Sequence, residues 1–187
     1  MECLGDTLEA LLRASGGVLS VDKVYTIGRA LIKTLRGVHE KGYVHRDVKP
    51  DNLMLPVDGS LEPYLVDFGD AKRYEELEVG EYESFGAVGT VPFMSVNVHK
   101  GMRHGRRDDM VSLAYTLIYL AHGTLPWYGC KDGRQCAEQK RDFVLSRLSP
   151  PVPSALQSFL DHAQSLGFDD QPDYSYLENQ LRLTPEP

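Results

Sequence analysis

The chain has 187 residues, of which 42% are hydrophobic, and its 27 acidic and 20 basic side chains give a formal charge of −7. This length is enough to bury one substantial core, and no shift in composition marks a boundary, so we expect a single domain over residues 1–187. The acidic balance argues against nucleic acid as a partner, because phosphate backbones bind clustered Lys and Arg.

The first residues and the apolar runs indicate neither a leader nor a membrane span. Residues 1–12 carry Glu2, Asp6 and Glu9 at positions where a secretory or mitochondrial leader needs basic side chains. The longest apolar stretch, residues 110–121, is shorter than the roughly 20 residues that a bilayer requires. Three cysteines with no metal-ligand or disulfide spacing are typical of a reducing compartment. We therefore expect a protein of the cytoplasm or the nucleus that does not enter membranes.

Two helices are predicted before the first polar motif. A short helix should cover residues 7–14 and end at Gly16 and Gly17, and Ser20 should cap a longer one. In this second segment apolar residues recur at helical spacing until Gly42 stops the helix. The recurring residues are Val24, Ile27, Leu31, Leu35 and Val38.

Two short strands and a polar loop are predicted next. Residues 53–55 and 64–66 have strand character, and the turn signal Asp58-Gly59 lies between them. Residues 71–89 are polar and acidic and show no clear period, which indicates an exposed loop.

The second half of the chain is predicted to be helical. Asp108 and Asp109 should open a buried helix that Gly123 and Pro126 end. Two further helices are separated by the helix-breaking run PPVP, and a last helix begins at a proline, whose fixed φ suits a first turn. These helices are predicted over residues 140–148, over residues 154–166 and from near Pro172. The expected fold is mainly α with a small β element.

The stretch VHRDVKPDN, residues 44–52, contains the groups that phosphoryl transfer requires. Asp47 is placed to accept the proton of an attacking hydroxyl, and Lys49 can face the γ-phosphate of ATP. Asn52 can offer its amide oxygen to Mg²⁺. The DFG that follows puts Asp67 at the end of a strand, where it could be a second metal ligand. The loop between the two strands should bring Asp67 back beside Asn52.

This combination is specific. The pattern HxDxxxxN alone also fits small-molecule phosphotransferases, but Lys49 together with an in-register DFG favours protein kinases that act on Ser or Thr. The alternative from the residues alone is a charged turn between a helix and a strand, without catalytic meaning.

The sequence resembles the casein kinase 1 family of Ser/Thr protein kinases over nearly its whole length. MECLGDTLEALL is similar to the hinge and following helix, HRDVKPDN to the catalytic loop, and DFGDAKRY to the start of the activation segment. GTVPFMSVNVHKG stands where that family has Ser-x-Asn-x-His-x-Gly instead of the Ala-Pro-Glu of most kinases. GRRDDMVSLAY, GTLPWYG and FDDQPDYSYLENQLR complete the likeness. The resemblance implies the large C-terminal lobe of a protein kinase, with ATP and Mg²⁺ as cofactors and proteins as substrates.

The resemblance also implies roles for single residues around the phosphate. Thr90 would contact Asp47 and Lys49 from the substrate-binding loop and favour a Ser or Thr hydroxyl. Asp109 would hydrogen-bond the backbone of the catalytic loop; the alternative from the sequence alone is a helix-start charge stabilised by the helix dipole. Pro92 stands where the family usually has an Arg that helps to bind an anion, which puts a preference for already phosphorylated substrates in question.

The hinge part of the resemblance concerns the nucleotide. Leu4 would offer backbone hydrogen bonds to adenine, with Glu2 beside it in the hinge and Met54 below the ring. Met1 falls at the hinge, so we expect the small lobe, with its glycine-rich loop, strand lysine and helix glutamate, to be missing from this chain. The nucleotide would then lie on an open shelf, with apolar surface exposed around Leu4, Met54 and Phe68. A partner that contains a small lobe is expected for this reason.

Three alternatives remain open at this stage. The missing lobe leaves a non-catalytic, pseudokinase-like binding module as a second function. A basic cluster is either a substitute anion site or a solvated helix face, and an acidic cluster either pairs with Arg46 or forms a solvated loop. The basic cluster comprises Lys131, Arg134, Lys140 and Arg141, and the acidic one Glu75, Glu76, Glu78, Glu81 and Glu83.

Overall fold

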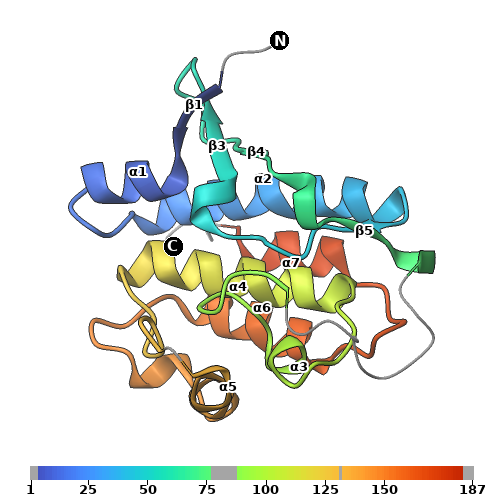
Figure 1. The fold of residues 1–187 in the computed structure, drawn as a ribbon. Coiled ribbons are helices and arrows are strands. Elements are labelled where there is room, and N and C mark those ends of the chain that lie inside the picture. The colour runs from blue at the N-terminus through green and yellow to red at the C-terminus, as the bar shows by residue number, and fades with distance from the viewer. Residues whose placement is uncertain (1–3, 77–87, 131, 183–187) are drawn as a thin grey trace.

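The structure is a computed structural model, and it describes residues 4–76, 88–130 and 132–182. Helices make up most of the molecule, and a small sheet projects from one end of it (Figure 1). The mainly α fold with a small β element that the sequence predicts is therefore confirmed for the described residues.

The sheet is antiparallel and has three strands, in the order β1-β3-β4. Met54 at its centre pairs with Thr7 on one side and with Tyr64 on the other. A second antiparallel pair is formed by β2, which precedes β3 in the chain, and β5, which follows β4. The strands are β1 (Leu4–Thr7), β2 (Tyr43–Val44), β3 (Leu53–Pro56), β4 (Tyr64–Leu65) and β5 (Lys72–Arg73). The strands predicted over 53–55 and 64–66 are confirmed within one residue, whereas the other three were not predicted.

The first two helices follow the sequence signals closely. Thr7 caps α1 (Leu8–Ala14) by accepting a hydrogen bond from the amide of Ala10 at 3.1 Å. Ser20 occupies the N-cap position of α2 (Val21–Glu40), although its side chain makes no capping hydrogen bond. The predicted apolar stripe of α2 is buried, apart from Val38, which is half-buried. This stripe packs α2 against α4 and α7.

Helix α4 (Arg106–His122) is the centre of the molecule. Every residue from Arg107 to Leu120 is buried, because α2 and α6 pack against it. The helix starts two residues before Asp108 and ends at Gly123, whose φ of +86° is typical of glycine after a helix. The expectation of a buried helix here is confirmed.

Two predicted elements are wrong. The irregular loop expected over residues 71–89 begins with the short strand β5 and a 3₁₀ turn, Tyr74–Glu76, and one of the remaining helices is misplaced. A helix over 140–148 is wrong, because α5 ends at Arg141 and only a 3₁₀ turn, Leu145–Arg147, follows. Asp132 caps the helix early, accepting from the amide of Arg134, and the amide of Leu145 then bonds to Gln157 of α6, which directs the chain away from a helical path. These helices are α3 (Val96–His99), α5 (Gly133–Arg141), α6 (Ser154–Ser165) and α7 (Tyr174–Gln180).

The buried apolar side chains form one contiguous cluster that runs from α1 to α7. Trp127, Tyr115 and Phe159 are among its largest members.

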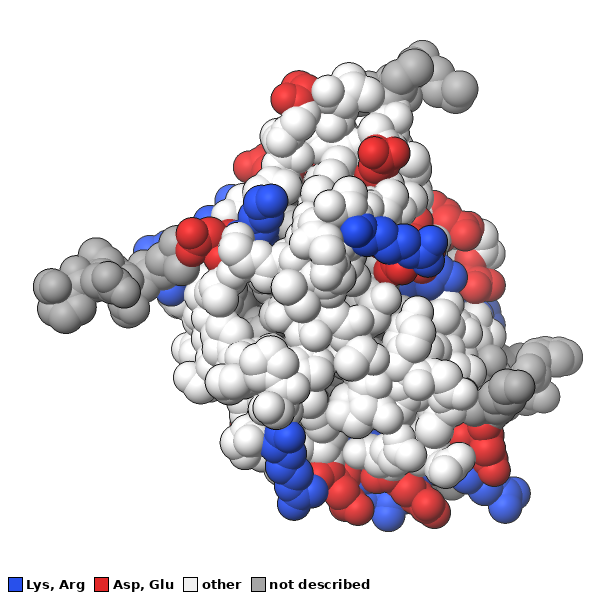
Figure 2. Space-filling model, turned by 90° about the vertical axis from the view of Figure 1, so that its left-hand side faces the viewer, with Lys and Arg blue, Asp and Glu red and all other residues white. Residues whose placement is uncertain are grey.

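Figure 2 views the left-hand side of Figure 1: uncharged side chains cover its middle, and charged ones lie toward the top and the bottom. In the part of the chain that the structure describes, no helix has the length and apolar character needed to cross a bilayer.

Candidate active site

The 44–52 loop runs from β2 to β3 and is held by one buried carboxylate. Asp109, in the first turn of α4, accepts the amide of His45 at 2.8 Å and the amide of Arg46 at 2.9 Å. Arg46 has a φ of +75°, a left-handed conformation that is unusual for a residue with a side chain. These two hydrogen bonds hold the loop in that conformation. Asp109 thus makes the backbone contact that the resemblance implies.

Two histidines complete the surroundings of Asp109. His39 of α2 and His104 each lie 3.0 Å from one of its oxygens through Nε2, and the Nδ1 of His39 lies 2.7 Å from the hydroxyl of Tyr174. Burial raises the pKa of Asp109, but the hydrogen bonds from His104 and His39 outweigh it and hold the pKa below its ordinary range. For His104, burial lowers the pKa, and the contact with Asp109 reverses the shift. A charged carboxylate is therefore stable in this dry position.

Asp47 is the centre of a second cluster. Its carboxylate accepts from the Nζ of Lys49 at 2.6 Å, from the hydroxyl of Thr90 at 2.7 Å and from the Nδ2 of Asn52 at 3.0 Å. Lys49 also donates to the hydroxyl of Thr90 at 2.8 Å. Burial raises the pKa of Asp47, but these hydrogen bonds more than compensate and leave the pKa below its ordinary value. Asp47 is thus an ionised acceptor at neutral pH.

Gly89 explains how Thr90 comes so close to the 44–52 loop. Its φ is +110°, and a Cβ at this position would lie 2.6 Å from the carbonyl oxygen of Arg46. Only a glycine allows this approach without strain. Sequence reasoning did not single out Gly89, although a glycine directly before Thr90 was the available signal.

The two expected metal ligands come together through the β3–β4 pair. Val66 donates its amide to the carbonyl of Asn52 at 2.9 Å, so that Asp67, the next residue, lies at the same end of the pair. His45 joins this end to Asp47, since its Nδ1 accepts the amide of Asp47 and its Nε2 contacts the carbonyl of Val66.

The donor set fits Mg²⁺. The Nδ2 of Asn52 is bound to the backbone and carboxylate of Asp47, which leaves the amide oxygen on the opposite side, and Asp67 is an exposed carboxylate. Both offer the hard oxygen atoms that Mg²⁺ prefers. Among the described residues no three His, Cys, Asp or Glu side chains form a metal site, so phosphate and water oxygens would have to complete the coordination. Asp67 itself has a left-handed φ of +61° and accepts the amide of Gly69.

The residues expected around adenine lie on the small sheet. Leu4 on β1 pairs with Pro56, and Met54 lies on the central strand; both are half-buried. Phe68 is 48% exposed, and its ring packs edge-on against His45. Of the apolar surface predicted around these three residues, Phe68 is thus the strongly exposed part. Glu2 lies outside the described residues.

A stack of rings and guanidinium groups holds the segment after DFG. Tyr74 stacks on Phe168 at 5.0 Å, with Arg106 over the ring of Tyr74 and Arg103 over that of Phe168. The hydroxyl of Tyr74 donates to the carbonyl of Phe168 and to Asp169. The start of this segment is therefore fixed to the end of the chain beyond α6.

The structure describes part of the acidic cluster and part of the basic cluster that the sequence contains. Arg46 donates through Nε to the carbonyl of Asp70, at the start of the acidic segment. Of the acidic residues, Glu75 and Glu76 are described, and the other three lie outside the described residues, so the proposed pairing stays a prediction. In the basic cluster, a solvated face is wrong for Lys140, which is 1% exposed, whereas Arg134 and Arg141 are exposed and Lys131 lies outside the described residues.

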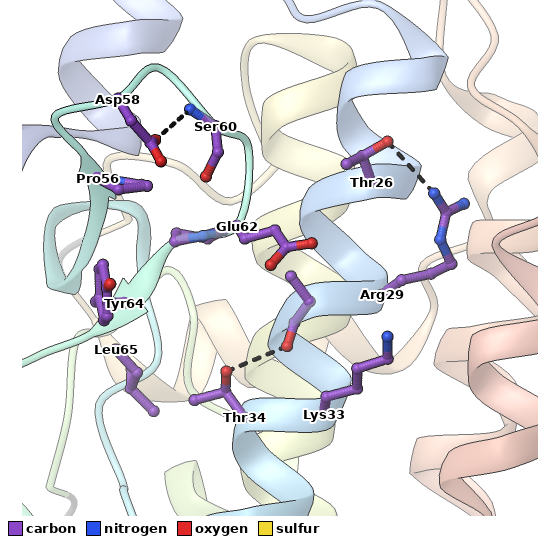
Figure 3. A pocket seen from close by; sticks show the side chains of 12 residues that line it. Thr26, Arg29, Lys33, Thr34, Pro56, Asp58, Ser60, Glu62, Tyr64 and Leu65 are labelled. Carbon is purple, nitrogen blue, oxygen red and sulfur yellow. Dashed lines mark hydrogen bonds between the residues drawn. The ribbon is translucent and has the colours of Figure 1, made fainter.

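A separate cavity of about 570 Å³ lies between α2 and the β3–β4 hairpin (Figure 3). Two hydrogen bonds join lining residues to one another: the amide of Ser60 donates to Asp58, and the hydroxyl of Thr34 donates to the carbonyl of Ala30. Arg29 donates to the carbonyl of Leu181. None of the lining residues belongs to the clusters around Asp47 or Asp109, so this cavity is not part of the candidate site.

Comparison with known families gives a match that covers most of the chain. The family model described as the protein kinase domain matches residues 1–166. This range contains the Asp47 cluster, the DFG and, apart from Tyr174, the whole Asp109 cluster.

Proposed function

Since the chain belongs to the protein kinase family, we propose that it is a Ser/Thr protein kinase of casein kinase 1 type, which transfers the γ-phosphate of ATP to protein hydroxyls. The observation that carries the proposal is the group formed by Asp47, Lys49 and Thr90, with contacts of 2.6–2.8 Å. An ionised carboxylate, a cation and a hydroxyl within one hydrogen-bonded group are the parts that orient a hydroxyl for phosphoryl transfer.

Each residue of this group has a role in the proposed reaction. Asp47 accepts the hydrogen bond of the substrate hydroxyl and directs its oxygen at the γ-phosphate. Lys49 places positive charge next to the transferring group, where charge develops. Thr90 fixes the carboxylate of Asp47 from the side of the protein substrate. Mg²⁺, when bound by Asn52 and Asp67, would neutralise phosphate charge.

We propose further that a small lobe completes the nucleotide site, either from preceding sequence or from a partner protein. The residues ahead of the 44–52 loop contain no glycine-rich phosphate loop and no strand lysine. β1 is an edge strand of the small sheet, and Phe68, which follows β4 at the other edge, is 48% exposed, so this end of the molecule offers surface for such a lobe. A non-catalytic binding module would use the same surface. The intact hydrogen bonding of Asp47 favours the enzyme.

The direct test is phosphate transfer. The chain is incubated with MgATP and with matched Ser, Thr and Tyr peptides, alone and with a protein kinase small lobe added in trans. We expect transfer to Ser and Thr peptides that Asp47→Asn abolishes and that Asp58→Asn, which changes a carboxylate in the exposed hairpin turn, leaves intact. Absence of transfer with every peptide, with and without the added lobe, would reject the enzyme.

A binding measurement separates the two candidate functions. MgATP at 100 times its dissociation constant should raise the free energy of unfolding by about 2.7 kcal/mol. Asp67→Asn should remove the part of this increase that depends on Mg²⁺. A chain whose melting temperature does not change with MgATP would support the binding module instead.

A further inference from the structure

Lys140, near the end of α5, is a buried cation that the proposed reaction does not use. Its Nζ lies 2.7 Å from the carbonyl oxygen of Val91, 2.7 Å from that of Met94 and 2.9 Å from the Nε2 of His99. The rings of Tyr115 and Trp127 lie 5.3 and 5.5 Å away. A buried ammonium is costly unless its protons are bonded, and here each of the three has a partner. Such a complete set of partners indicates a specific role.

Two partners of Lys140, the carbonyls of Val91 and Met94, belong to the segment that directly follows Thr90. Trp127 donates its indole N–H to the carbonyl of Pro92 at 2.7 Å, between the two carbonyls that Lys140 holds. The amides of Phe93 and Met94 in turn donate to the carbonyl of Thr90 at 2.9 and 3.1 Å. The backbone of residues 90–94 is thus fixed by the turn at Thr90 and by the side chains of Trp127 and Lys140.

This fixed segment leads straight to the catalytic carboxylate. The hydroxyl of Thr90 bridges Asp47 and Lys49, and Gly89 touches the backbone of Arg46. A shift of the turn would move Thr90 away from Asp47. Lys140 is therefore connected to Asp47 through one short piece of backbone.

We propose that Lys140 is a positioning residue for the reaction: it holds the 90–94 segment so that Thr90, and the substrate hydroxyl beside it, are correctly placed at Asp47. The proposal rests on the proposed function. It also excludes Lys140 from an anion site, because an anion would have to displace two backbone carbonyls from its ammonium group. Pro92 does not offer an anion site either, because its carbonyl accepts the indole N–H of Trp127 and proline has no backbone N–H to donate.

The hydrogen bonds can survive loss of the proton. Burial lowers the pKa of Lys140 to about 7, and burial followed by the charge of Lys140 lowers the pKa of His99 to about 4. A neutral amine still has two N–H groups for the carbonyls of Val91 and Met94. Neutral His99 can then donate from Nε2 to the free lone pair. The segment should therefore stay in place across neutral pH.

The first test does not depend on activity. Hydrogen exchange of the amides of Phe93 and Met94 is compared in the unchanged chain, in Lys140→Met and in Lys100→Met. Lys100 is an exposed lysine at the end of α3, so its substitution is a matched control. We expect these two amides to exchange faster in Lys140→Met than in the unchanged chain, and at an unchanged rate in Lys100→Met. Unchanged exchange in Lys140→Met would overturn the proposal.

The second test measures the reaction under the conditions in which the chain transfers phosphate. Misplacement of a substrate-binding group by about 1 Å can cost about 100-fold in rate, so Lys140→Met should lower kcat/KM for the peptide by about 10- to 100-fold. Affinity for MgATP should not change, because Leu4 and Met54 lie on the small sheet, and Asn52 and Asp67 lie at the end of its β3–β4 pair. A positioning role would be contradicted if kcat/KM for the peptide and the affinity for MgATP both fell, or if neither changed.

A double-mutant cycle distinguishes positioning from general loss of structure. In a Thr90→Val background the effect of Lys140→Met on kcat/KM should shrink to less than about threefold, because the group it positions is already absent. Independent, multiplying effects would overturn the proposal. If Lys140→Met does not fold, Trp127→Phe, which removes the hydrogen bond to Pro92 and keeps an aromatic ring, takes its place in both tests as a probe of the same segment. If the unchanged chain transfers no phosphate, the proposed function fails, and the exchange experiment alone decides whether Lys140 fixes the segment.

Discussion

Asp109 shows how much one buried carboxylate determines in this molecule. It is fully buried, and four donors from three parts of the chain meet on its two oxygens: the amides of His45 and Arg46 and the rings of His39 and His104. Removal of one acceptor leaves buried donors without partners, which costs more than the net value of the lost bond.

We predict that Asp109→Asn lowers the free energy of unfolding by about 3–5 kcal/mol, because an amide puts a donor where a donor already points. Urea denaturation measures the change, and hydrogen exchange at the amides of His45 and Arg46 shows whether the 44–52 loop is released. Asp22→Asn, in the exposed first turn of α2, is the control and should change stability by less than about 0.5 kcal/mol. A loss of under about 1 kcal/mol in Asp109→Asn would contradict this account of the site.

The lowered pKa of Lys140 predicts that the free energy of unfolding depends on pH. Its pKa is about 7 in the folded protein against an ordinary 10.5, so between these values the unfolded chain binds more protons. The free energy of unfolding therefore rises with pH through this window, and the contribution is lost as the pH falls through 7. His99 and Tyr115 face Lys140 and stay neutral there, since burial lowers the pKa of the first and raises that of the second.

The measurement is the difference in stability between the unchanged Lys140 and Lys140→Met at pH of about 7.5 and about 9.5. The difference should move in favour of Lys140 at the higher pH. Cys136 also faces the ammonium, but burial raises the pKa of its thiol to about 11. Cys130 lies nearby as well, so both proteins should carry Cys130→Ser. A difference that is equal at both pH values would show that Lys140 keeps its ordinary titration.

The sequence predicted part of the candidate site. Asp47, Lys49 and Asn52 were named in advance because a motif fixes both residue types and spacing, and Thr90 was named because of the family resemblance; the structure brings the four together. His39 and His104 were missed, and Lys140 was named only as a member of the basic cluster, as an anion-binding or solvated residue. His39 continues the apolar stripe of α2 four residues after Leu35, which is a usable signal for a buried polar group. His104 has no such signal, because only the folded chain places it at Asp109.

At the scale of elements, α2 shows how the surrounding packing determines whether a glycine can be replaced by a larger residue. Gly28 faces the core, where a Cβ would lie 2.5 Å from a methyl group of Leu181 and 3.0 Å from one of Leu117. Gly37 lies on the same helix with nothing within 4 Å of a built Cβ. The same residue type therefore has a packing role at one position and none at the other.

We predict opposite effects for this pair of positions. Gly37→Ala should raise the free energy of unfolding by about 0.5–1 kcal/mol, because alanine has the higher helix propensity and fits the free space. Gly28→Val should lower it by about 1–3 kcal/mol, because the side chain overpacks the contact of α2 with α4 and α7. Chemical denaturation of both variants tests this. Equal effects at the two positions would refute the packing argument.

The strongly patterned elements were predictable and the weakly patterned ones were not. α2 has a long apolar stripe at helical spacing, and α4 contains the longest apolar run of the chain, so both have strong helical signals. The misplaced helix at 140–148 has a physical cause: the cap at Asp132 starts α5 earlier, and Lys140 then falls four residues after buried Cys136, on the same buried face. β2 and β5 have two residues each and exist only because they pair with one another.

At the scale of the whole molecule, one apolar cluster joins all the larger helices. We predict that the chain unfolds in a single transition. Trp127 is the only tryptophan and is fully buried near α5, so its fluorescence reports on one end of the cluster, whereas far-UV circular dichroism reports on all helices. The two melting curves should coincide. Separate midpoints would show that the α5 region and the α2–α4 region unfold independently.

The stack of Tyr74 on Phe168 has a consequence for where the protein can be cut. The protein kinase family model stops at residue 166, yet Phe168 and Asp169 hold the segment after DFG, and Tyr174 contacts His39 beside Asp109. A version shortened to the matched range would lose the contacts that Phe168 and Asp169 make with the segment after DFG and the contact of Tyr174 with His39, while it would keep every motif residue. For expression and engineering, the safe boundary of this protein therefore lies after α7, beyond the limit that family similarity alone would suggest.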